Sequence, residues 1–435
     1  MDPGSVKVFS SRNLPRLNYI ADLLLNDILG LSWELVTDKR KLGKHPVINY
    51  SGEDIPGSFK ICPSGLLSET GIKVQNITVS QWKNLPVFFQ PADRSDFPFD
   101  IFAAAFYLVT RYEEYQLNDP DRYGRFRSKN SLALRNGFLR LPVIELWTRE
   151  LANTLVRKYQ YLAFKRGNYN AETTIDADEA FRFCGKGFLR SSTSFVSDII
   201  SGRGDAKSRF SCLMKKTRDP YDVFDYIFNS ADSSGCDTKF FVPVGNSSEF
   251  DENPSWRSSD YRNLIKKISA RFETGVHPSF RAGSDFNRLR KESQRLGSIT
   301  SREIRLSRFH YLRIRFPESY KNLAASGIRE DFSMGYSDEP GFRAGISRPF
   351  RFFDVSDDRI YDLVIKPFQF MDAMFIGDRQ SKPEAAQEVI GDLIRETRIA
   401  GGTFTSIWHN TTLTETEEGR KWRRVFEFTL KNQQP

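Results

Sequence analysis

Hydrophobic and polar residues follow a mixed pattern in the first third of the chain. Apolar residues repeat at helical spacing over residues 18–33, which predicts a helix with one buried face. Residues 46–50 and 85–89 are short apolar runs typical of strands. Residues 100–115 and 141–162 again predict helices. We therefore expect a small N-terminal α+β domain, of unknown role, over residues 1–165.

Strand-like runs alternate with amphipathic helices in the rest of the chain. Seven runs have this character, near residue 173 and at residues 239–244, 274–276, 303–306, 332–334, 363–365 and 404–407. Such alternation favours a parallel sheet with helices around it. Residues 166–435 are predicted to form a distorted, seven-stranded β/α barrel, so the fold class is α/β.

Capping signals predict where two of the helices begin. Asp219 followed by Pro220 is typical of an N-cap followed by proline at the first helical position. Ser381, Pro383 and Glu384 match a capping box. Residues 190–218, rich in Ser, Gly and Lys, are expected to form an excursion over the barrel rim.

Length and charge narrow the class of protein. A chain of 435 residues exceeds what one core usually supports, which favours two domains. The net charge of +9 comes mainly from residues 257–329. No basic run is long and no nucleic-acid module is apparent, so solvated helix faces explain the charge better than an anionic partner does. We expect no nucleic-acid partner.

The cysteines and the hydrophobic runs indicate the cell compartment. Cys62, Cys184, Cys212 and Cys236 lack close pairing, which is typical of reduced thiols. Residues 1–13 lack the apolar core of a signal peptide, and no apolar run is long enough to cross a bilayer. A cytoplasmic protein without a transmembrane segment is expected, and its oligomeric state is open.

Candidate chemistry gathers where the predicted strands end. Asp176, Asp178, His277, His310 and His409 each follow such a run. Since the carboxyl ends of parallel strands meet on one face, these side chains are expected in one site. Taken singly, a histidine after a strand is more often structural, and an Asp pair is often a helix cap. Together they predict a metal site or acid/base catalysis.

These residues also resemble a known family. Asp176-Ala177-Asp178, the run from Gly275 to Ser279, the run from Arg308 to Tyr311 and the run from Ile407 to Asn410 resemble, in order, the motifs of the polysaccharide deacetylases, also called the NodB-homology or carbohydrate esterase 4 family. The resemblance covers about residues 173–424. Residues 96–147 look like the domain that precedes it in a bacterial subgroup, typically from Bacteroidetes.

The resemblance implies a role for each catalytic residue. It implies that Asp176 is the base that activates a water, that Arg308 orients this base and that His409 protonates the departing amine. It implies that Asp178 and His277 bind a divalent metal, with zinc expected. The corresponding chemistry joins metal polarisation of an acetyl carbonyl to two proton transfers.

The chain departs from the family pattern at the second metal histidine, where it has Arg281. Because a catalytic zinc site normally has three protein ligands, His310 is the hypothetical third ligand. Glu179 replaces the glycine that often follows the aspartates.

Three further residues are candidates for substrate binding. Tyr311 matches the aromatic residue of the family's groove. Arg343 lies in a glycine-rich stretch and could hold an anionic group or pair with an aspartate, or it could be an ordinary surface arginine. Trp408 could stack on a sugar ring, although a core position is slightly favoured.

The expected function is metal-dependent hydrolysis of an N-acetyl group on a sugar of a surface polysaccharide or its precursor. The cytoplasmic expectation favours a nucleotide- or lipid-linked precursor. A catalytically impaired, glycan-binding pseudoenzyme is the main alternative, because the second histidine is missing. Hydrolysis of another non-peptide C–N bond is a third possibility.

Overall fold

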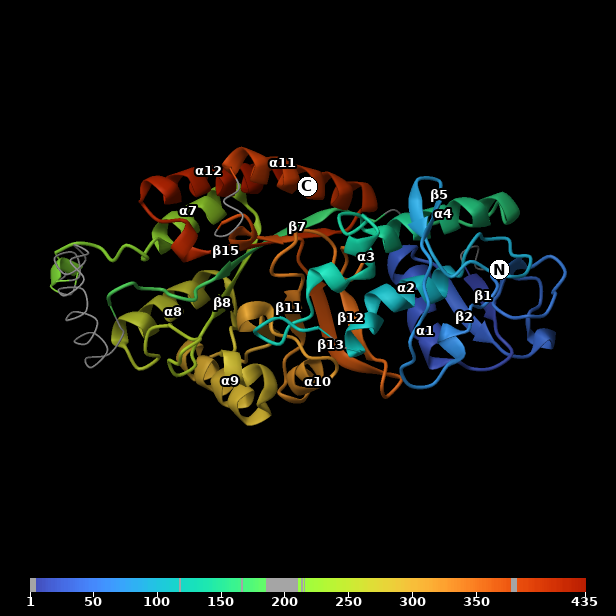
Figure 1. The fold of residues 1–435 in the computed structure, drawn as a ribbon, viewed down its shortest axis with the longest axis horizontal. Coiled ribbons are helices and arrows are strands. Elements are labelled where there is room, and N and C mark those ends of the chain that lie inside the picture. The colour runs from blue at the N-terminus through green and yellow to red at the C-terminus, as the bar shows by residue number, and fades with distance from the viewer. Residues whose placement is uncertain are drawn as a thin grey trace.

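The computed structural model describes residues 5–116, 119–165, 167–184, 210–212, 214, 216–376 and 382–435. Most of the predicted excursion at residues 190–218 lies outside the described residues, as does Ser381 of the predicted capping box. Figure 1 shows the N-terminal region at one end of the molecule and the larger sheet with its helices at the other.

Four short parallel strands form the main sheet of the N-terminal region. Their order is β2-β1-β3-β4, with bounds β1 (Ser5–Phe9), β2 (Ser32–Val36), β3 (Val47–Asn49) and β4 (Phe59–Lys60). Helix α1 (Pro15–Ala21) and the π-helix η1 (Asp22–Ile28) connect β1 to β2. The predicted helix over residues 18–33 therefore ends early, and Trp33 lies in a strand. Parallel strands joined by a crossover make this region α/β rather than α+β.

Helices and a hairpin complete the N-terminal region. Its other elements are η2 (Lys39–Lys41), η3 (Leu66–Ser68), the antiparallel pair β5 (Ser80–Trp82) and β6 (Leu85–Val87), α2 (Ile101–Val109), η4 (Tyr112–Tyr115), η5 (Ser128–Asn130), α3 (Leu132–Arg135) and α4 (Val143–Lys158). The side chain of Asp100 caps α2 by accepting from the Ala103 N–H at 3.0 Å. Every residue of α2 is buried, as its apolar run predicts.

The large sheet has nine strands. Their order is β12-β13-β11-β10-β9-β8-β7-β15-β14, and the described neighbours are parallel except β12 and β13. The bounds are β7 (Asn170–Asp176), β8 (Asp237–Val242), β9 (Glu273–Val276), β10 (Leu306–Ser307), β11 (Glu330–Met334), β12 (Phe350–Asp354), β13 (Arg359–Pro367), β14 (Phe370–Met371) and β15 (Thr403–His409). Each of the seven predicted strands overlaps one of these strands, although the run at residues 303–306 shares only Leu306 with β10. The two additional strands, β12 and β14, make the count nine instead of seven.

Helices cover the outside of this curled sheet. Figure 1 shows α7, α11 and α12 on one side and α8, α9 and α10 on the other. The bounds are α7 (Phe224–Ser234), α8 (Ser259–Arg271), η6 (Phe280–Ser284), α9 (Phe286–Thr300), η7 (His310–Leu312), α10 (Glu318–Ala325), η8 (Asp372–Met374), α11 (Pro383–Ala400), η10 (Asn410–Thr412) and α12 (Glu417–Asn432). Among the described residues, no helix combines the length and apolarity needed to span a membrane.

One predicted cap has a different role. Helix α7 begins at Phe224, so Asp219 does not cap it. The Asp219 carboxylate instead accepts from the backbone N–H groups of Arg182 and Phe183, both at 2.8 Å. It therefore fixes the start of the segment that follows β7.

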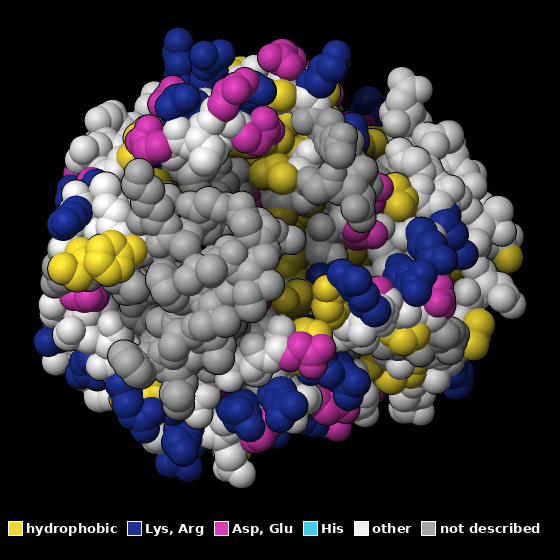
Figure 2. Space-filling model, turned by 60° about the vertical axis from the view of Figure 1, so that its left-hand side comes forward, with side chains coloured by type: hydrophobic (Ala, Val, Ile, Leu, Met, Phe, Trp, Pro, Cys, Tyr) yellow, Lys and Arg dark blue, Asp and Glu magenta, His cyan; other side chains and the backbone are white. Residues whose placement is uncertain are grey.

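The basic excess is spread among acidic groups. On the face drawn in Figure 2, Lys and Arg side chains stand among Asp and Glu side chains. Several basic residues of the 257–329 region form exposed ion pairs, such as Lys267 with Asp225 at 2.5 Å and Arg305 with Glu303 at 2.7 Å. These pairs agree with the interpretation of solvated charges, on helix α8 for Lys267 and on the segment before β10 for Arg305.

A buried charge network joins the N-terminal region to the large sheet. Arg343 donates from Nε to the Glu114 carboxylate at 2.9 Å and from Nη1 to the Gly335 carbonyl at 2.8 Å. Arg111 donates to Glu114 at 2.7 Å and also bonds to the Arg343 carbonyl. All three charged side chains are buried. Arg343 is therefore not a surface arginine, and the substrate-binding role predicted for it has no support in its position.

We predict that Glu114→Ala lowers the free energy of unfolding by about 3–5 kcal/mol, because it leaves two buried guanidinium groups without their shared carboxylate. Urea unfolding measures the loss. The control is Asp392→Ala, which removes a carboxylate from an exposed pair with Arg395 and should cost less than about 1 kcal/mol. Equal losses in the two variants would contradict the proposed importance of the buried network.

Candidate active site

The five candidate residues at the strand ends meet in one cavity. Asp176 is the last residue of β7 and is in register with His409, the last residue of β15. His277 follows β9 directly, and His310 comes three residues after β10. Together with Asp178 they line a cavity of about 500 Å³. The structure thus brings together all the residues for which the sequence predicted a common site.

Asp178, His277 and His310 form a compact group of potential metal ligands. One ligand atom from each lies within 4.8 Å of the others. His277 Nε2 lies 3.0 Å from one Asp178 oxygen, and His310 Nε2 lies 3.6 Å from the other. Two imidazoles and one carboxylate are a common donor set for catalytic zinc.

Unsatisfied polar atoms test whether this group fits a cation. Asp178 Oδ1 and His277 Nε2 are both buried and, although 3.0 Å apart, neither has a hydrogen-bond partner among the described residues. Buried polar atoms without partners are costly, and a cation between them would satisfy both. The donor set therefore fits a divalent metal. Arg281, at the position of the family's second histidine, is exposed and absent from the cavity lining, whereas His310 lies where a third ligand is needed.

Two aspartates that the sequence did not indicate hold the histidines. Asp251 accepts from His310 Nδ1 at 3.0 Å, and Asp372 accepts from His409 Nδ1 at 2.6 Å. Burial lowers the pKa of His310, but the charges of Asp178 and Asp251 outweigh it and raise this pKa to about 9. Burial also lowers the pKa of His409, but the charge of Asp372, together with those of Asp178 and Asp176, outweighs it and raises this pKa to about 10. In both rings the carboxylate leaves Nε2 as the nitrogen available to the site.

A buried arginine fixes Asp176, the first aspartate of the pair. Arg308 is fully buried and donates from Nη1 to Asp176 Oδ1 at 2.9 Å and to Thr174 Oγ1 at 2.7 Å. Its Nε donates to the Phe332 carbonyl at 3.0 Å. The other oxygen of Asp176 lies 4.0 Å from His409 Nε2. Arg308 therefore has the position that the orienting role requires.

The other two predicted substrate contacts differ from each other in position. Tyr311 lines the cavity next to His310. Trp408 is fully buried and packs edge-on against Phe370 and Phe426, with ring centroids at 5.7 and 5.0 Å. Since residues along a strand alternate between faces, Trp408 points away from the face of its neighbour His409. Trp408 is a core residue, the position that the sequence slightly favoured, and the alternative role of stacking on a sugar has no support in its position.

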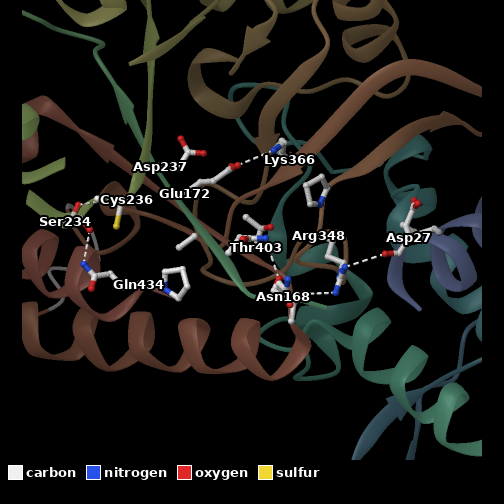
Figure 3. A pocket seen from close by; sticks show the side chains of 18 residues that line it. Asp27, Asn168, Glu172, Ser234, Cys236, Asp237, Arg348, Lys366, Thr403 and Gln434 are labelled. Carbon is white, nitrogen blue, oxygen red and sulfur yellow. Dashed lines mark hydrogen bonds and ion pairs between the residues drawn. The ribbon is translucent and has the colours of Figure 1, made fainter. Parts of the chain in front are cut away.

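A larger cavity lies at the opposite end of the sheet. It has a volume of about 810 Å³ and is lined by residues near the amino ends of β7, β8 and β15, including Glu172, Asp237 and Thr403. Figure 3 shows Glu172 paired there with Lys366, at 3.2 Å. Catalytic groups in parallel β/α folds lie at the carboxyl ends of the strands, so the smaller cavity is the better candidate active site.

The chain matches one family model and is similar to several solved structures. A family model matches residues 6–160 and describes a family of unknown function, DUF7033. No curated protein matches the chain. A solved structure assigned as a polysaccharide deacetylase, from Mycobacterium smegmatis, shares 15% identity at a TM-score of 0.39, over 61% of this chain and 84% of that one.

Two other solved structures are similar at the same level. A polysaccharide deacetylase from Bacillus cereus shares 9% identity at a TM-score of 0.28, over 61% of this chain and 87% of that one. A 4-alpha-glucanotransferase from Thermococcus litoralis shares 12% identity at 0.35, over 62% of this chain and 37% of that one. At these TM-scores the likenesses carry no weight for function, which has to be inferred from the residues of the cavity.

We predict that the purified protein binds one divalent ion and that Asp178→Ala, His277→Ala and His310→Ala each abolish or strongly weaken this binding. Each change removes one of the three clustered ligands. Metal content after dialysis, measured by mass spectrometry, checks the outcome. His45→Ala is the control, because it removes a histidine outside the group. Unchanged metal content in His310→Ala would exclude that residue as the third ligand.

We also predict that the carboxyl group of Asp331, on β11, makes the free energy of unfolding depend on pH. Burial raises the pKa of its carboxyl from 3.8 to about 7, against the opposing bonds from Ser333. The pKa of Asp331 is higher in the folded state than in the unfolded state. Its contribution to the free energy of unfolding is therefore fully present below about pH 4 and is lost as the pH rises to about 7. Asp331→Asn should therefore gain roughly 2–3 kcal/mol relative to the unmodified protein between about pH 5 and about pH 8. Urea unfolding at both pH values measures it, and Asp392→Asn, in an exposed pair, should show no such gain.

Proposed function

We propose that this protein is a metal-dependent hydrolase that removes an N-acetyl group from a sugar of a surface polysaccharide or its precursor. The observation that supports it most is the combination, in one cavity, of an Asp-His-His ligand group with two further residues, Asp176 and His409, whose side chains lie 4.0 Å apart. The first group fits a cation, and the second fits two proton transfers. Amide hydrolysis needs both.

A divalent ion bound by Asp178, His277 and His310 would supply Lewis-acid polarisation of the acetyl carbonyl and lower the pKa of an attacking water. The residues around that position do the remaining work. Asp178 lies at the centre, with one oxygen 3.6 Å from both His310 Nε2 and His409 Nε2. Both histidines thus face the Asp178 carboxylate with Nε2, while their Nδ1 atoms bond to different aspartates, Asp251 and Asp372.

Asp176 and His409 handle the protons in this proposal. Arg308 occupies one oxygen of Asp176, so the other oxygen is the one that accepts a proton from the attacking water. His409 keeps its Nδ1 on Asp372 and presents its Nε2 to the cavity, where it donates a proton to the departing amine. A base and an acid that meet at 4.0 Å can serve the two sides of one scissile bond.

The location and the substrate carrier are part of the same proposal. We place the reaction in the cytoplasm, on a nucleotide- or lipid-linked precursor, in line with the expectation from the sequence. The cavity of about 500 Å³ has room for a sugar with its acetyl group.

We predict that the metal-loaded protein releases acetate from N-acetylhexosamine substrates and that Asp176→Asn and His409→Gln each lower kcat by about 10²–10⁴-fold. Both variants should keep their metal, because neither residue belongs to the ligand group. Enzymatic detection of acetate, alongside metal analysis, measures both properties. His45→Gln is the matched control. Metal binding without acetate release from any such substrate would refute the deacetylase proposal and favour a glycan-binding role or another C–N bond.

A further inference from the structure

One segment of the N-terminal region reaches the candidate active site. Arg125 is among the residues that line the cavity, whereas the other described lining residues all come from position 176 onward. It is also the one Lys or Arg among those lining residues. The segment around it, residues 119–130, lies outside the barrel in sequence and yet contributes to the cavity wall through Arg125.

Arg125 is oriented by hydrogen bonds within its own segment, and it donates a hydrogen bond to the turn η7 of the barrel. Its Nε donates to Asp121 at 2.7 Å, and the same carboxylate accepts from the backbone N–H groups of Tyr123 and Arg125, both at 2.9 Å. With the guanidinium oriented in this way, Nη1 donates to the Tyr311 carbonyl at 2.8 Å. Arg125 is thus a rigid link between the N-terminal segment and the turn η7.

Tyr123 provides a second link to the same turn. Its ring packs on the Tyr311 ring with centroids at 4.8 Å. Its carbonyl accepts from Arg313 Nε at 3.0 Å. The N-terminal segment therefore contacts both the tip of η7 and the residue that follows it.

The turn needs such support because its backbone is strained. Tyr311 and Leu312 have φ values of 59° and 53°, in the left-handed region that side chains other than glycine rarely adopt. Strained residues of this kind persist when their surroundings hold them. His310 directly precedes them, so the orientation of its ring depends on the same turn.

We propose that the N-terminal region is a working part of the active site, in which Arg125 and Tyr123 hold the η7 turn and so position His310. Arg125 is a positioning residue, since it acts through the Tyr311 backbone. The consequence for metal affinity rests on the proposed function, whereas the support of the turn does not. A role is thereby assigned to the region that matches a family of unknown function.

The test is hydrogen exchange of the metal-free, full-length protein. The amides of His310, Leu312 and Ile314 are hydrogen-bonded to backbone carbonyls, so their exchange reports on the turn. In Arg125→Ala, exchange over residues 309–315 should rise at least about tenfold, and the rise in Arg125→Lys should be smaller, because the lysine ammonium keeps a cationic donor. The control is Lys129→Ala, which removes a cation from the same segment, at an exposed pair with Asp119, and should leave the exchange unchanged.

Zinc titration by calorimetry is the second measurement. Arg125→Ala should weaken zinc binding by about tenfold, as changes behind a metal ligand generally do. Unchanged exchange in Arg125→Ala would overturn the proposal whatever the metal result. Faster exchange with unchanged zinc affinity would overturn the positioning of His310.

The same two measurements distinguish a failure of the proposed hydrolase function from a failure of the proposed support of η7. If the unmodified protein binds no metal while exchange rises in Arg125→Ala, the hydrolase proposal fails and the support of the turn stands. If Arg125→Ala does not fold, Tyr123→Leu takes its place, since it removes the ring contact with Tyr311 and should raise the same exchange rates.

Discussion

Arg308 lies fully buried across the interior of the curled sheet, and its bonds constrain the whole barrel. It follows β10, yet it donates to Thr174 and Asp176 on β7, two strands beyond its immediate neighbour β9. In a flat sheet, strands three positions apart would be about 14 Å from each other. The long Arg308 side chain spans part of that interval, and the curl of the sheet brings Thr174 Oγ1 to 2.7 Å and Asp176 Oδ1 to 2.9 Å from its Nη1. A buried guanidinium without these partners would be strongly unfavourable, so curvature and site geometry stabilise each other.

Whether a site residue could be predicted from the sequence depends on whether it lies at the end of a strand with a clear apolar pattern. Asp176, His277 and His409 follow apolar strands, and that periodic signal places them at strand ends. Asp251 lies in a loop without such a signal, and Asp372 follows β14, a strand of two residues that is too short to show a period. Neither carboxylate could be assigned to a histidine, because the pairing depends on contacts between residues 59 and 37 positions apart.

Arg343 and Trp408 show the limit of local patterns in another way. The glycine-rich surroundings of Arg343 suggested an exposed turn, but its partner Glu114 is 229 residues away in the sequence. Trp408 is adjacent to a site histidine, although alternation along β15 turns it into the core. The parallel pairing of the N-terminal sheet was missed for a related reason. Strands of two to five residues, such as β1 and β4, carry too little apolar pattern to distinguish parallel from antiparallel pairing.

The strand ends gather the reactive groups but cannot enclose them. Parallel strands deliver Asp176, His277 and His409 to one edge, and that edge is open to solvent unless loops build walls around it. Here the loop after β8 supplies Asp251, and η7 supplies His310 and Tyr311. Neither wall belongs to the sheet or to a long helix, so each needs contacts from outside its own segment to keep one conformation. The N-terminal region provides such contacts for η7, and its buried Arg111–Glu114–Arg343 network ties it to the sheet from which the site is built. The N-terminal region contributes none of the Asp and His residues of the candidate site, and yet its contacts can determine how accurately those residues are placed.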